Sequence, residues 1–176
     1  MNKRGDFLSV QSLIVLCFPG IAMCMDFIME RVVNEFIIVL FLAGFWWQIR
    51  QNGILGGLSG VMGFLFPCIL LLPLFYFRML GAGDIKLFSG LGIFLGIPDV
   101  FKLILCSLIL GGLLSFAFLI SCGNLKERFS YFFNYVYKYS QSKVLYPYMK
   151  KGNQPENFHF TVPIFLSVML YVGGFY

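Results

Sequence analysis

Six apolar runs separated by polar segments dominate the chain, at residues 7–25, 36–49, 54–77, 87–101, 103–122 and 160–176. A helix needs about 20 apolar residues to cross the hydrocarbon core of a bilayer, within a range of about 17–25. The first, third and fifth runs meet this requirement, the sixth nearly does, and the other two are shorter. The fourth run continues into the fifth, and we expect Pro98 to force a turn or kink between them. The pattern predicts an all-α, polytopic membrane protein with about six transmembrane helices.

Composition supports a membrane protein. Of the 176 residues, 59% are hydrophobic and only 12% are charged, whereas a water-soluble surface is about 25–35% charged. The net charge of +5 does not indicate nucleic acid, because the cations lie at the ends of apolar runs, as they do beside membrane lipid. The five cysteines form no C-x-x-C pair and His159 is the only histidine, so we expect no metal site and no cofactor.

The distribution of Lys and Arg predicts the orientation. With six spans, the segments at 26–35, 78–86 and 122–159 share one side of the membrane. That side carries nine cations: Arg31, Arg78, Lys86, Lys126, Arg128, Lys138, Lys143, Lys150 and Lys151. The other side carries four: Lys3, Arg4, Arg50 and Lys102. The positive-inside rule makes the first side cytoplasmic. We therefore expect one membrane-embedded domain over residues 1–176, with a cytoplasmic loop at about 122–158.

Two acidic residues stand at junctions between an apolar helix and the cytoplasmic side. Asp26 ends the first run and Asp84 precedes the fourth. Because two spans separate them, both carboxyl groups reach the same membrane face in either orientation. An acid at membrane depth costs about 2.5–3.5 kcal/mol on insertion scales and usually faces the bundle interior. Taken singly, Asp84 can also be read as a helix cap.

Two carboxyl groups held close together share a proton and titrate in two separated steps. One then serves as a base that takes a proton from water, and the other as an acid that protonates a peptide carbonyl and the leaving amine. This is the chemistry of aspartic proteases. It predicts Asp26 and Asp84 as a catalytic pair.

Neighbouring residues offer supporting roles. Gly81 and Gly83 lack a Cβ, so the backbone can adopt unusual torsions and an extended substrate can approach. Lys86 either tunes the pair of acids or anchors its helix at the interface by snorkelling. Arg31 and Asn34 either orient the first acid or act as a helix cap and interface anchor.

These motifs resemble those of the type IV prepilin peptidases, membrane aspartyl proteases of the G-x-G-D class. Residues 81–96, GAGDIKLFSGLGIFLG, closely resemble the second catalytic segment of the family, G-x-G-D-x-K-L followed by a glycine-rich helix. Residues 25–34, MDFIMERVVN, resemble the first, although Val33 stands where the family usually has proline. Residues 161–174, TVPIFLSVMLYVGG, are loosely similar to its proline-containing last helix.

The resemblance implies the substrate and the cellular location. Substrates would be type IV prepilins or pseudopilins, which carry a short basic leader, a glycine at the cleavage point and then an apolar helix. Cleavage would occur at the cytoplasmic face of a prokaryotic cytoplasmic membrane. Long family members also carry a cytoplasmic domain with two C-x-x-C pairs and methylate the new N-terminus. This chain has no such pairs, so we expect a short form without N-methyltransferase activity.

Two other interpretations remain open at the level of sequence. A small membrane scaffold or ion-conducting subunit could use Asp26 and Asp84 as a proton or cation site, because intramembrane acids commonly serve as ion sites. The chain could also be a different G-x-G-D protease, similar to signal peptide peptidase or presenilin.

Overall fold

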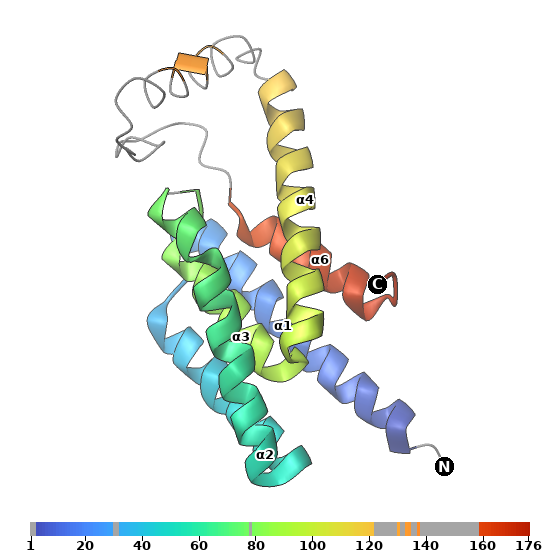
Figure 1. Cartoon of the computed structure of the whole chain (residues 1–176). Coiled ribbons are helices and arrows are strands. Elements are labelled where there is room, and N and C mark those ends of the chain that lie inside the picture. Colours follow the sequence, from blue (N-terminus) through green and yellow to red (C-terminus); the bar gives the residue numbers. More distant parts are fainter. Residues whose placement is uncertain are drawn as a thin grey trace.

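The computed structural model describes residues 3–29, 32–77, 79–121, 130, 133, 134, 137 and 159–176. These residues form five helices (Figure 1): α1 (Lys3–Met29), α2 (Asn34–Tyr76), α3 (Ala82–Leu95), α4 (Ile97–Ser121) and α6 (Thr161–Val172). The described residues include no strand, so the predicted all-α class is confirmed. Arg31 and most of the predicted loop at 122–158 lie outside the described residues.

Helix α2 reverses direction at Gly53, and its two arms, residues 34–52 and 54–76, run antiparallel (Figure 1). Gly53 has φ 62° and ψ −147°, a backbone conformation that is essentially restricted to glycine. The ring centroids of Phe41 and Phe64 lie 4.9 Å apart, whereas a straight helix would separate these positions by about 35 Å. The second and third apolar runs of the sequence correspond to these two arms.

The chain turns between α3 and α4 at Gly96, which has φ 77°. Pro98 lies in the first turn of α4, where its missing N–H breaks no helical hydrogen bond. The sequence prediction of a turn at Pro98, with an apolar run continuing to residue 101, is therefore wrong in detail. Glycine at a positive φ ends α3, and residues 97–101 belong to the next helix.

Helix α3 is the centre of the bundle and packs against α1, α2 and α4. Every residue from 87 to 94 is buried, as expected for a helix that is surrounded on all sides. Glycines allow the close approach: a Cβ added to Gly63 would overlap the carbonyl oxygen of Gly92, and the reverse also holds. The position of α3 is therefore fixed by backbone contact with the second arm of α2.

Side-chain amides satisfy the carbonyl groups at the C-terminal end of α3, which have no partner within the helix. Gln48 Nε2 donates to the Ile93 carbonyl oxygen at 2.7 Å, and Gln11 Nε2 donates to that of Phe94 at 2.8 Å. These bonds tie α3 to α1 and to the first arm of α2. The opposite end of α3 carries Asp84.

Among the described residues, three helices are long and apolar enough to cross a bilayer, judged by length and composition: α1 within Gln11–Met29, α2, and α4 within Ile97–Phe118. Helix α6 is apolar but shorter. Large apolar side chains face outward, including Ile54 and Leu55, which are 90% and 78% exposed. This surface is that of an integral membrane protein, and the number of six spans stays a prediction.

Candidate active site

Asp84 lies in the first turn of α3, where its carboxylate is held by the backbone that precedes the helix. Gly81 is the N-cap, with extended φ −75° and ψ 152°. The Gly81 N–H donates to Asp84 Oδ2 at 3.1 Å. A carboxylate in this position also interacts favourably with the positive end of the helix dipole.

The two glycines of the G-x-G-D segment differ in their surroundings. A Cβ on Gly81 would lie 3.1 Å from Asp84 Oδ2, so a side chain there would crowd the carboxylate. A Cβ on Gly83 would lie 3.6 Å from Val32 Cβ, which is ordinary van der Waals contact. Neither glycine has a positive φ, so the expectation of unusual torsions at these positions is wrong. Gly83 is simply a residue of α3.

Asp26 lies near the C-terminal end of α1 and contacts residues at the beginning of α6. Thr161 Oγ1 donates to Asp26 Oδ2 at 2.8 Å, and His159 Nδ1 lies 3.0 Å from the same oxygen. The imidazole ring of His159 also packs against the Phe27 ring, with centroids 4.9 Å apart. Asp26 is thus joined to a part of the chain that lies more than 130 residues away in sequence.

The two aspartates interact electrostatically. Burial raises the pKa of Asp84 from its ordinary 3.8 to about 6, and the hydrogen bond from Gly81 opposes this rise. The negative charge of Asp26 raises the pKa of Asp84 further, whereas His159 lowers it. Asp84 precedes the predicted fourth span and is in none of the three helices that are long enough to cross a bilayer. In Figure 1 the end of α1 and the beginnings of α3 and α6 lie at the same end of the bundle.

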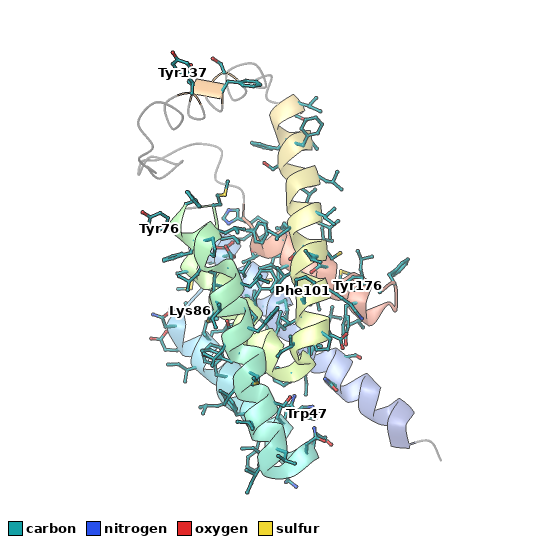
Figure 2. The ribbon with its side chains drawn as sticks, viewed as in Figure 1. Trp47, Tyr76, Lys86, Phe101, Tyr137 and Tyr176 are labelled. Carbon is teal, nitrogen blue, oxygen red and sulfur yellow. The ribbon has the colours of Figure 1, made fainter. Side chains whose placement is uncertain are left out.

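Lys86 and Asn34 contact each other. Lys86 Nζ donates to Asn34 Oδ1 at 2.8 Å, and Figure 2 shows Lys86 beside the beginning of α2. This bond links the N-terminal part of α3 to the first residue of α2. Arg31, the remaining predicted residue, lies outside the described residues.

Neither His159 nor Thr161 was predicted as a site residue from the sequence. His159 directly precedes the last apolar run and Thr161 is the second residue of that run. Neither gives a sequence signal for a contact with Asp26, which is distant in sequence. Only the folded arrangement of α1 against α6 brings these side chains together. Within the described part of the chain, no three His, Cys, Asp or Glu side chains are grouped as metal ligands would be.

Comparison with known protein families matches residues 13–116 to the type IV leader peptidase family. The match spans more than half of the 176 residues. The chain belongs to this family. A search of curated proteins and of solved structures found no significant match.

Membership of the type IV leader peptidase family agrees with the resemblance seen in the sequence motifs. The matched range contains both Asp26 and Asp84, and it ends before His159 and Thr161. The family match therefore says nothing about His159 and Thr161, and their contacts with Asp26 come from the structure of this leader peptidase.

Proposed function

We propose that this chain cleaves the leader peptide from type IV prepilins or prepilin-like proteins, and that Asp26 and Asp84 together activate the attacking water. The electrostatic coupling of the two aspartates at one end of the bundle carries the mechanistic part of the proposal. Family membership supports a peptidase rather than an ion-conducting subunit.

In the proposed reaction, the ionised carboxylate of the pair takes a proton from water, and the water oxygen attacks the carbonyl carbon of the scissile peptide bond. The protonated carboxyl donates its proton to the carbonyl oxygen. When the C–N bond breaks, the first carboxyl gives its proton to the leaving amine, and the second regains one from the tetrahedral intermediate. The raised pKa of Asp84 suits this residue to the role of proton donor.

The test is cleavage of a purified prepilin by variants that lack one carboxyl group. We expect Asp26→Asn and Asp84→Asn each to lower the cleavage rate by at least about 100-fold, the usual contribution of a general acid or base. Asp99→Asn is the matched control, because Asp99 is also partly buried but bonds to Lys102 and Tyr171 instead.

Cleavage at the wild-type rate by either Asp26→Asn or Asp84→Asn would rule out the aspartate pair. Proteoliposomes provide the second readout, because an ion-conducting subunit would lose proton or cation flux in the same two variants. We expect no flux that depends on either residue.

We further propose that the site faces the cytoplasm, on the basis of the nine cations against four on the two predicted sides. A soluble peptide that contains a leader and cleavage point cannot cross a sealed membrane. Inside-out vesicles should therefore cleave it without detergent, whereas right-side-out vesicles should do so only after permeabilisation. The reverse pattern would show the opposite orientation.

A further inference from the structure

The oxygen Oδ2 of Asp26 is held by the first residue of α6, Thr161, and by His159, which lies two residues before that helix. Thr161 is buried, with 1% of its surface exposed, and its hydroxyl donates at 2.8 Å. His159 Nδ1 approaches the same oxygen at 3.0 Å. Among the described residues, both hydrogen bonds to this carboxyl group therefore end on one oxygen.

The packing of α1 against α6 does not depend on this polar contact. Val15 and Ala22 of α1 belong to the same buried cluster as Ile164 and Val168 of α6. Gly20 also lies against Phe165, whose ring would be 3.3 Å from an added Cβ. A buried hydroxyl and a partly buried carboxylate cost free energy unless they are paired. The two bonds thus fix the direction of the Asp26 side chain, whereas apolar contacts hold the helices together.

Two further features favour one orientation of the His159 ring and of the Asp26 carboxylate. The Phe27 ring packs on the imidazole of His159 and limits its rotation. Thr161 is the first residue of α6, so the carboxylate lies at the positive end of that helix dipole. Because the carboxylate of Asp26 accepts the hydrogen bond, Nδ1 of His159 carries the hydrogen.

We propose that His159 and Thr161 are positioning residues that hold Oδ2 of Asp26, so that Oδ1 is the oxygen presented to the attacking water. The inference rests on the proposed function, because it assigns these two residues a role in the same reaction. Neither residue touches the substrate in this scheme; each acts through Asp26. Loss of either bond leaves the carboxyl free to rotate, and fewer molecules then have Oδ1 in place.

The test compares variants that remove a hydrogen-bond donor with variants that retain it. Thr161→Val removes the hydroxyl at constant shape, and Thr161→Ser retains it. His159→Phe keeps a ring against Phe27 but has no donor, and His159→Asn places an amide nitrogen where Nδ1 stands. Ser167→Ala is the control, because Ser167 is on the same helix and its buried hydroxyl bonds, among the described residues, only to the Ile164 carbonyl oxygen.

We expect Thr161→Val and His159→Phe each to lower kcat by about 10- to 100-fold with KM changed less than about threefold, the kinetic equivalent of losing one hydrogen bond to a charged group. Thr161→Ser and His159→Asn should recover most of this loss, and Ser167→Ala should match the wild type. Thermal unfolding in detergent shows whether each variant is folded. A wild-type kcat in the two donor-free variants, or Thr161→Ser as slow as Thr161→Val, would overturn the proposal.

A second measurement does not depend on cleavage. His159 is the only histidine, so 15N labelling of histidine gives one pair of imidazole nitrogen signals. We expect Asp26→Leu to shift the Nδ1 signal and Asp99→Leu to leave it in place. An unshifted signal in Asp26→Leu would refute the contact itself. If the wild type cleaves no prepilin while the signal shifts, the proposed function fails and the contact stands.

Discussion

Lys86 Nζ donates a 2.8 Å hydrogen bond to Asn34 Oδ1, and this bond connects two residues that are 52 positions apart in sequence, one on α3 and one on α2. Both side chains are exposed. The bond lies two residues beyond Asp84 on α3, so it joins the end of the bundle that carries this aspartate to the beginning of α2. Its value for stability is limited by solvent, which competes for exposed polar groups.

A double-mutant cycle measures the strength of this bond. We expect the single changes Lys86→Met and Asn34→Leu to show a coupling energy of about 0.2–1 kcal/mol in unfolding experiments, the range for exposed pairs. The Asp99–Lys102 pair on α4, with N and O 3.2 Å apart, is the comparison. A coupling of zero would show that this exposed bond adds nothing to the stability of the folded protein.

Asp84 should make the stability of the protein depend on pH. Its pKa is about 6 in the folded protein against an ordinary 3.8, so the folded state binds more protons between these values. The free energy of unfolding therefore falls as the pH rises from about 4 to about 6, by at most about 3 kcal/mol, and stays lower above that. Asp84→Asn removes this dependence and should stabilise the protein more at pH 8 than at pH 4. Equal effects at both pH values would contradict the raised pKa.

The rate of cleavage should depend on the same ionisation. If protonated Asp84 is the proton donor, kcat/KM falls above about pH 6 by about tenfold per pH unit, because the protonated fraction falls by that factor. His159 lowers the pKa of Asp84, so His159→Phe should move this descending limb to higher pH. A profile that stays flat up to pH 8 would exclude Asp84 as the proton donor.

The contact between Gly63 and Gly92 should tolerate no side chain. A Cβ on Gly63 would overlap backbone atoms of α3, which cannot move aside as a flexible side chain can. We expect Gly63→Ala to destabilise the protein by about 1–3 kcal/mol, as overpacking does in other cores. Gly112→Ala is the control, since no atom lies within 4 Å of its added Cβ. Equal stability of the two variants would show that α2 and α3 pack less closely.

Gly53 should be required for stability only because of its backbone conformation, and not because of a lack of space for a side chain. No atom lies within 4 Å of a Cβ added there, so any loss comes from φ 62° and ψ −147°. We expect Gly53→Ala and Gly53→Asn each to destabilise the protein by about 1–3 kcal/mol, because asparagine does not favour this region either. Full stability of Gly53→Asn would indicate an ordinary left-handed turn instead.

The sequence was sufficient to predict the all-helical class and to place Asp26 and Asp84 at the same end of the bundle. Both inferences depend on the lengths of the apolar runs and on the even number of spans between the two acids. These features can be taken directly from the local sequence. The turn between the fourth and fifth apolar runs was predicted but assigned to Pro98, which is the stronger local signal, whereas the decisive φ of Gly96 is a property of the folded backbone.

The partners of Asp26 were not predictable for a different reason. His159 and Thr161 lie more than 130 residues from Asp26 in sequence, and the loose similarity of residues 161–174 to the family's last helix assigns neither of them a contact with Asp26. Their contact with Asp26 results from how α6 packs against α1. For Asn34 the sequence left two roles open, orienting the first acid or acting as a helix cap or interface anchor, whereas in the structure its amide oxygen accepts from Lys86, because α2 begins next to α3.

The reversal at Gly53 bears on how the polypeptide is made. The two arms of α2 are joined through a tip of Arg50, Gln51 and Asn52, so they can leave the ribosome and enter lipid as one helical hairpin. Insertion of such a hairpin requires the transfer of a single cation, Arg50, rather than a hydrophilic domain. A lengthened polar tip at this position would therefore slow biogenesis of the protein without altering its mature peptidase site.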